Sequence, residues 1–357
     1  MEIQDLINSK TFHFESNRLN FEAGIGCKLR CGGCSMRFHM KPGAPRYKMN
    51  GWDRRYNIRF EKYKVIFDVF EDYEFCGNLS DPIYHPDFVK TIKYLKGKNK
   101  QINFRTNGHG KSKKWWTEVF TICQGENWKW TFALDGLPKD SYKYRINQDG
   151  EQVWEMMKLG KTFGLNISWQ WIVFNYNQDD LNDGHLLAAQ YGIDFFDYHS
   201  TRFFDDRELG GIDMRVYEPR KEYISLKREE LYEEEYEIRI EDAISDNKVE
   251  IDADCLNHHM TKPIMFNSMG YFIPCCEKDQ YVESMEKRGF YQDKYHIDNL
   301  HTAEDVYNVF TSDTWQNFYK GLYDDVKNAP YRCKEFCSKN DNRDPLTGEG
   351  LNSKGFV

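Results

Sequence analysis

Residues 27–34 read Cys-Lys-Leu-Arg-Cys-Gly-Gly-Cys, which places three thiols in one short loop. Clustered thiols in a reduced protein are typical of metal ligands. A structural zinc site closes with four ligands, whereas Cys27, Cys31 and Cys34 have no fourth ligand beside them. Three thiolates can bind three irons of a [4Fe–4S] cube and leave the fourth iron open to an outside ligand. Half of a zinc knuckle is the alternative interpretation of this loop.

Composition narrows the class of protein. The 357 residues are enough for about two domains. A formal net charge of −8 argues against a general binder of nucleic acid or anionic membranes. The chain is 40% hydrophobic, which excludes a disordered protein, and it has neither an apolar run of membrane-spanning length nor a visible secretory signal. We therefore expect a cytoplasmic protein whose ten cysteines stay reduced, with no nucleic-acid or membrane partner.

Strand-like and helix-like segments alternate over the first two hundred residues. Helices are expected from about Pro86, over 153–163 and over 181–191. Strands are expected at 20–25, 72–76, 101–106, 130–134, 166–174 and 193–198. Such repeated units predict an α/β fold with a parallel sheet, namely a partial (β/α)6 TIM-type barrel.

Polar or small residues follow five of these segments, and in such folds the chemistry lies at the carboxyl ends of the strands. Ordinary turn formation is the alternative explanation for any one of them. Taken together, they predict one mouth that is ringed by Cys27, Gly77, Asn107, Asp135 and Asn175.

The C-x3-C-x2-C loop, placed after a strand-like segment, resembles the radical S-adenosylmethionine (radical SAM) superfamily. The resemblance implies a [4Fe–4S] cluster on Cys27, Cys31 and Cys34, with SAM on the open iron. It also implies reductive cleavage of SAM to a 5′-deoxyadenosyl radical that abstracts hydrogen from a substrate. An electron donor such as flavodoxin or ferredoxin is then expected.

Four further segments resemble SAM-binding motifs of that superfamily, in the same order along the chain. Residues 75–87 resemble the second-strand motif that cradles the SAM amine, and 105–108 resemble the third-strand Thr-Asn-Gly. Residues 132–136 with Arg145 resemble the fourth-strand segment, and 171–175 the fifth-strand region against the adenine. The resemblance therefore implies SAM contacts from Gly77, Asn78, Ser80, Asp81, Asn107, Asp135, Arg145, Val173 and Asn175.

A second set of cysteines follows an acidic stretch. Cys255 precedes Gly270 by fourteen intervening residues, Cys275 follows after four more, and Cys333-x3-Cys337 completes the set. The glycine predicts a hairpin that returns one cysteine towards another. These four thiolates could close a [4Fe–4S] cluster or a zinc site, and adjacent Cys276 is an alternative ligand to Cys275.

This second set resembles the SPASM and shorter twitch extensions of radical SAM enzymes, and it implies one auxiliary [4Fe–4S] cluster in a small α+β iron–sulfur domain. We expect a barrel over 1–205, an acidic linker or helical segment over 206–250, the auxiliary domain over 251–340 and a flexible tail over 341–357. The resemblance implies modification of a peptide or protein side chain. The alternatives are dehydrogenation or modification of a small alcohol or sugar-like substrate, and a non-catalytic iron–sulfur or zinc-binding module.

Overall fold

The computed structural model describes residues 18–34, 36, 57–199, 213–220, 223, 264–274 and 282–324. Within these residues eight strands form one sheet in the order β6-β5-β4-β3-β2-β1-β7-β8. The strands are β1 (Arg18–Phe21), β2 (Asp72–Phe75), β3 (Gln101–Thr106), β4 (Trp128–Ala133), β5 (Asn166–Ile172), β6 (Asp194–Tyr198), β7 (Ile264–Phe266) and β8 (Phe272–Ile273). All pairs from β6 to β7 are parallel, so the predicted α/β class is confirmed.

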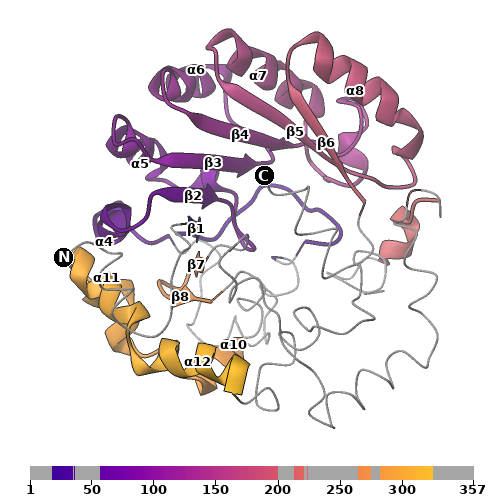
Figure 1. Ribbon diagram of the computed structural model, residues 1–357. Coiled ribbons are helices and arrows are strands. Elements are labelled where there is room, and N and C mark those ends of the chain that lie inside the picture. The colour runs from indigo at the N-terminus through magenta and orange to yellow at the C-terminus, as the bar shows by residue number, and fades with distance from the viewer. Residues whose placement is uncertain are drawn as a thin grey trace, which may run out of the picture.

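The helices between the strands lie on the outer side of the curved sheet, as Figure 1 shows. Those that follow β2 to β5 alternate with the strands, as a barrel of β/α units requires. The helices are α4 (Phe60–Tyr63), α5 (Phe88–Leu95), α6 (Lys113–Cys123), α7 (Gly150–Thr162), α8 (Leu181–Gln190), α10 (Val282–Lys287), α11 (Ala303–Phe310) and α12 (Asp313–Asp324). Among the described residues, none of the helices combines the length and apolarity needed to cross a membrane.

Strand β7 belongs to the range predicted as the auxiliary domain, yet it extends the barrel sheet. It pairs in parallel with β1, with Phe21 opposite Phe266. It then turns back through an antiparallel pairing with β8. The turn ends at Gly270, whose φ of 83° suits glycine best, so the predicted hairpin is confirmed.

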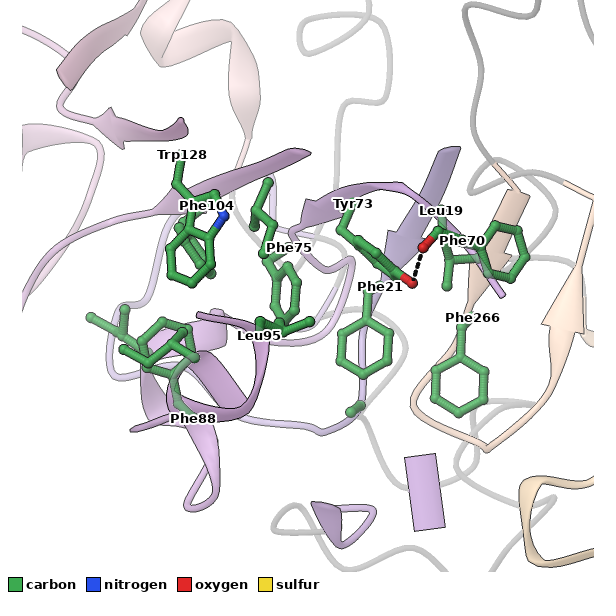
Figure 2. Close-up of a cluster of buried hydrophobic side chains, with 14 of the residues drawn as sticks. Leu19, Phe21, Phe70, Tyr73, Phe75, Phe88, Leu95, Phe104, Trp128 and Phe266 are labelled. Atoms are coloured by element: carbon green, nitrogen blue, oxygen red, sulfur yellow. Dashed lines mark hydrogen bonds between the residues drawn. The ribbon is translucent and has the colours of Figure 1, made fainter. Parts of the chain in front are cut away.

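The two faces of the sheet differ sharply in chemistry. Aromatic side chains alternate along the strands on the face that meets the helices, and Figure 2 shows Phe75, Phe104 and Trp128 in this layer. The rings of Phe104 and Trp130 stack at 4.4 Å between centroids, and Phe88 of α5 packs edge-on against Phe104 at 5.6 Å. Burial of each such side chain contributes about 1.5–3 kcal/mol. This layer therefore holds the helices on the sheet.

Capping side chains begin two of the outer helices directly after strand-end loops. Ser112 Oγ accepts a hydrogen bond from Trp115 N at 3.2 Å at the start of α6. Asp149 Oδ1 accepts one from Gln152 N at 3.0 Å at the start of α7. A cap at an N-terminus satisfies backbone donors that the helix leaves open. Because β2 to β5 run in parallel, the loops between strand ends and helices are gathered along one edge of the sheet.

Candidate active site

The cysteine loop is joined to the loop after β2 by backbone hydrogen bonds. Gly26 N donates to Leu79 O at 3.0 Å, and Asp81 N donates to Gly26 O at the same distance. Gly26 has a φ of 149°, which non-glycine residues rarely adopt. The first cysteine and the loop that resembles a SAM-amine cradle are therefore held side by side, as the sequence predicts.

The three cysteines share one partly buried cluster. Cys31 is 9% exposed, and Cys27 and Cys34 are half-buried around Leu29 and Tyr144. Burial raises the pKa of the Cys31 thiol to about 12, against which the positive charge of Arg145 acts. Burial also raises the pKa of Cys27, and the neighbouring charges of Asp81, Cys31 and Cys34 add to it. Thiols of this kind ionise when a metal binds them.

The chemistry of the three thiols is compatible with an iron–sulfur cube. Within the described ranges, no group of three or more His, Cys, Asp and Glu side chains could hold a metal ion. A cube makes a different demand, because each cysteine binds a different iron and the three sulfurs need not converge on one point. The three thiols are free of disulfides and close enough to perturb one another electrostatically. The donor set and its neighbours therefore fit three corners of a [4Fe–4S] cluster.

Two hydrogen-bond donors meet the sulfur of Cys27. Leu29 N and Asn107 Nδ2 each lie 3.4 Å from Cys27 Sγ. The Asn107 amide is oriented by further bonds, since its Oδ1 accepts from His109 N at 3.0 Å and from Tyr84 Oη at 3.2 Å. Hydrogen bonds to ligand sulfur tune the reduction potential of iron–sulfur clusters. The predicted site residue Asn107 thus contacts a predicted cluster ligand.

Asp81 ties the loop after β2 to the end of β3. Its Oδ2 accepts from both Asn107 N and Asn107 Nδ2 at 2.6 Å. Its Oδ1 accepts from Thr106 Oγ1 at 2.8 Å and from Ile83 N at 3.2 Å. Burial raises the pKa of this carboxyl to about 6, against the effect of these donors. The structure places Asp81 at the predicted mouth, with its oxygens bonded to protein groups.

Glu22 is a site residue that the sequence reasoning missed. It is 1% exposed, and its Oε1 accepts from Leu79 N at 2.6 Å and from Ser80 Oγ at 3.1 Å. A Cβ at Gly77 would lie 2.1 Å from the same oxygen, so the loop can approach the carboxylate only with glycine there. The sequence feature that could have identified Glu22 is that it is the single acidic residue in the otherwise nonionic segment 20–26.

Asp135 and Arg145 form a buried ion pair beside the cysteine loop. Arg145 Nε lies 2.7 Å from Asp135 Oδ2, and Asp135 Oδ1 accepts from Ile172 N at 2.8 Å. Asp135 is fully buried, and the carboxylate charge raises the pKa of Arg145 against the effect of burial. The guanidinium in turn favours the ionised form of Cys31. Two predicted SAM contacts are therefore brought together with a predicted cluster ligand.

The end of β5 meets a segment that is distant in sequence. Asn175 is exposed, and it donates from its backbone N to Tyr217 O at 3.0 Å and from Nδ2 to Val216 O at 2.8 Å. Val173 is fully buried, and its N donates to Tyr198 O at 3.0 Å. Around this junction lies an aromatic group that the sequence reasoning missed, consisting of Tyr144, Phe174, Tyr176 and Tyr217.

The remaining predicted residues are placed as follows. Asn78 Nδ2 lies 3.9 Å from the sulfur of Met265 in β7, so the loop after β2 also meets the second part of the chain. The auxiliary-cluster cysteines Cys255, Cys275, Cys333 and Cys337, together with Cys276, lie outside the described residues.

Comparison with known proteins shows which solved structures share the fold of this chain. No protein-family model and no curated protein matches the sequence. Among solved structures, Streptococcus suis SuiB bound to S-adenosylmethionine aligns over 93% of this chain and 77% of its own, with a TM-score of 0.55 and 13% identity. SuiB bound to its precursor peptide SuiA aligns over 87% of this chain and 66% of its own, with a TM-score of 0.53 and 13% identity.

This chain thus spans about two thirds of the length of SuiB in the peptide-bound structure. The shared sheet and helices confirm the partial-barrel α/β fold that the alternation of strands and helices predicts.

Proposed function

We propose that the protein is a radical SAM enzyme in which Cys27, Cys31 and Cys34 bind a [4Fe–4S] cluster and SAM occupies the open iron. The observation that carries the proposal is the gathering of three thiols at the carboxyl edge of a parallel barrel sheet. When bound, the cluster supplies the electron for reductive cleavage of SAM to a radical that abstracts hydrogen from a substrate.

The residues around the loop have separate tasks in this proposal. Glu22 holds residues 77–80 in place by accepting two hydrogen bonds, so that this loop can receive the SAM amine. Asp135 holds Arg145 in place, so that the guanidinium lies next to Cys31 and close to where the SAM carboxylate would bind. Asn107 presents an N–H to Cys27. Val173 and Asn175 hold the end of β5, where the adenine is expected.

The proposed substrate is a peptide or protein side chain. The support is the likeness of fold to SuiB, whose structure was determined with a precursor peptide. A small alcohol or sugar-like substrate is the alternative within the same chemistry.

The proposed electron donor is a small acidic carrier such as flavodoxin or ferredoxin. Two lysines lie against the ring of Tyr84 next to the cysteine loop, with Lys28 Nζ at 5.6 Å and Lys111 Nζ at 5.7 Å from its centroid. Lys28 is exposed in a chain of net charge −8. Opposite charge steers such partners to the surface nearest the acceptor. Cluster chemistry of this kind also requires a reducing compartment, for which we propose the cytoplasm.

We further propose that Cys255, Cys275, Cys333 and Cys337 bind one auxiliary [4Fe–4S] cluster in a domain over 251–340, with 1–205 as the barrel. The support is the spacing of these cysteines. Within this range, the described strands β7 and β8 extend the barrel sheet next to β1.

The test is anaerobic reconstitution followed by iron counting and measurement of 5′-deoxyadenosine released from SAM with dithionite. We expect about eight irons per chain with both clusters, about four of them lost in Cys31→Ala together with product release. Cys123→Ala, in a thiol buried in the outer core, should keep both. Cys333→Ala should lose only the auxiliary iron.

Three results would contradict the proposal. The first is bound zinc with no 5′-deoxyadenosine from the wild type, which would favour a non-catalytic zinc module. The second is undiminished release by Cys31→Ala. The third is full iron retention by Cys333→Ala, which would refute only the auxiliary cluster.

A further inference from the structure

The inner face of the barrel sheet is polar, although the interior of a β/α barrel is usually filled with bulky apolar side chains. On β2, β3 and β4 the aromatic and aliphatic residues alternate with residues that face away from the outer helices. These inward residues are Asp72, Glu74, Asn103, Arg105, Lys129 and Thr131.

A charged network crosses this face. Glu74 is paired with Arg105 and, at 2.9 Å, with Arg18. Its Oε1 also accepts from Asn103 Nδ2 at 3.0 Å. Burying ion pairs costs desolvation that their attraction only partly offsets, so such a network is weak evidence for a stabilising role. A functional reason for a polar lumen is therefore favoured.

A cavity of about 390 Å³ opens on the inner face near the amino ends of the strands. Single waters need only about 10–15 Å³ of this kind of space, so the cavity is large enough for a polar side chain together with its solvent. Amide groups of Gln101 and Asn166 line it and can both donate and accept. We call this space the lumen cavity.

Lys129 differs from the other cations on the wall of the lumen cavity. Arg18 and Arg105 are paired with Asp72 or Glu74. Lys129 is half-buried on the cavity wall and forms no ion pair with any other described residue. A half-buried ammonium that lacks a carboxylate partner can bind a carboxylate of a ligand.

We propose that the lumen cavity binds an acidic side chain of the peptide substrate, with Lys129 as its ion-pair partner. This inference rests on the proposed function, because it assumes a peptide substrate. Lys129 lies six residues before Asp135 on the same strand and loop, which is about 20 Å in extended chain. The lumen cavity is thus an anchoring subsite, several peptide residues away from the carbon that loses hydrogen.

The probes are three capped peptides, Ac-Ala-Glu-Ala-NH2, Ac-Ala-Gln-Ala-NH2 and Ac-Ala-Lys-Ala-NH2. Dissociation constants are measured on the full chain by saturation-transfer NMR at low ionic strength, with peptide up to millimolar concentration. The wild type should bind the glutamate peptide about fivefold more tightly than the glutamine peptide, as one partly desolvated ion pair predicts. Lys129→Met should abolish this preference, and Lys129→Glu should shift it to the lysine peptide.

Two matched variants complete the design. Lys64→Met removes an exposed lysine on the outer side and should keep the wild-type preference. Asp194→Asn removes a carboxylate from the cavity rim and should keep or increase it. Equal affinity of the wild type for the glutamate and glutamine peptides, or a preference that persists in Lys129→Met, would overturn the proposal.

Release of 5′-deoxyadenosine without peptide is measured on the same variants. It should stay within about twofold of wild type in Lys129→Met, because Lys129 is remote from the cysteine loop. A wild type that binds the glutamate peptide selectively but does not cleave SAM would refute the proposed function alone. A wild type that cleaves SAM but shows no charge preference would refute the subsite alone.

Discussion

The side-chain amide of Asn107 donates a hydrogen bond to the sulfur of Cys27, with 3.4 Å between Nδ2 and Sγ. Asp81 accepts from the same nitrogen at 2.6 Å and holds the amide in this orientation. A residue at the end of β3 thereby reaches a cysteine that follows β1. An N–H directed at a ligand sulfur stabilises the more electron-rich, reduced form of an iron–sulfur cluster.

Replacing Asn107 with Leu should lower the midpoint potential of the reconstituted cluster by tens of millivolts, because the donor to Cys27 is lost. Potentials followed by EPR during redox titration measure this shift. Tyr84→Phe is the matched control, since it removes a bond to Asn107 Oδ1 and leaves the donor to sulfur intact. An unchanged potential in Asn107→Leu would show that the contact does not act on the cluster.

Glu22→Ala should lower the free energy of unfolding by about 1–3 kcal/mol, because the buried Leu79 N–H loses its acceptor. SAM binding should weaken as residues 77–80 lose their support. Glu22→Gln keeps an acceptor oxygen and should retain most of the stability and most of the affinity for SAM. Urea unfolding and calorimetric titration of SAM provide the measurements. The control Glu61→Ala removes an exposed pair with Lys90 and should cost well under 1 kcal/mol.

Gly77→Ala should destabilise the wild type by more than it destabilises Glu22→Ala, because its Cβ would lie 2.1 Å from Glu22 Oε1. The contact with Ser80 Oγ at 2.6 Å would remain in both backgrounds. A double-mutant cycle in urea measures the coupling, which should be about 0.5–3 kcal/mol. Gly321→Ala, with open space around it in α12, should be neutral or stabilising. Strict additivity would rule out the proposed close contact.

Arg145→Met should cost about 3–5 kcal/mol of stability, since it leaves the fully buried Asp135 carboxylate without its partner. The double variant Asp135→Asn with Arg145→Met should regain part of that loss. Iron loading should fall in Arg145→Met, because Cys31 loses the neighbouring positive charge, and should recover in part in the double variant, because the opposing charge of Asp135 is removed as well. Thermal unfolding and iron content test the two effects separately. Equal iron loading in Arg145→Met and the wild type would contradict the electrostatic role.

The His199–Asp197 pair at the end of β6 predicts a pH dependence. The hydrogen bond between His199 Nε2 and Asp197, at 2.6 Å, raises the pKa of His199 and lowers that of Asp197. The stability that protonated His199 contributes is complete below the pKa of histidine in the unfolded chain, near 6.5. This stability is lost as pH rises through the higher pKa of His199 in the folded protein. The aspartate contribution is lost only as pH falls below about 4.

Unfolding in urea should therefore show a loss of stability as pH rises above about 6.5, and Asp197→Asn should abolish this loss. The pair is one third exposed, so the effect should stay below about 1 kcal/mol. His301→Gln, at an exposed histidine, is the control and should leave the slope unchanged. A slope in Asp197→Asn equal to that of the wild type would assign the pH dependence to other groups.

The positions of the barrel strands were predicted well because the sequence patterns that indicate them depend on residues close together in the chain. Alternation of apolar and polar residues and the caps of the helices depend on near neighbours, and the strands β2 to β6 lie within about two residues of their predicted positions. The cysteine loop was likewise visible, since its three cysteines lie within eight residues of one another. Glu22 was not, because its partners Leu79 and Ser80 are more than fifty residues away.

The sequence by itself therefore determined the order of strands and helices, the three-thiol loop and the residues at the strand ends. Only the tertiary structure decided which of these meet. It pairs Asp135 with Arg145, directs Asn107 at Cys27 and leaves Lys129 unpaired among the described residues of a polar lumen. The physical reason is that charges and hydrogen bonds act over a few ångströms in space. Which distant residues come that close depends on strand register and sheet curvature, and no local pattern encodes these.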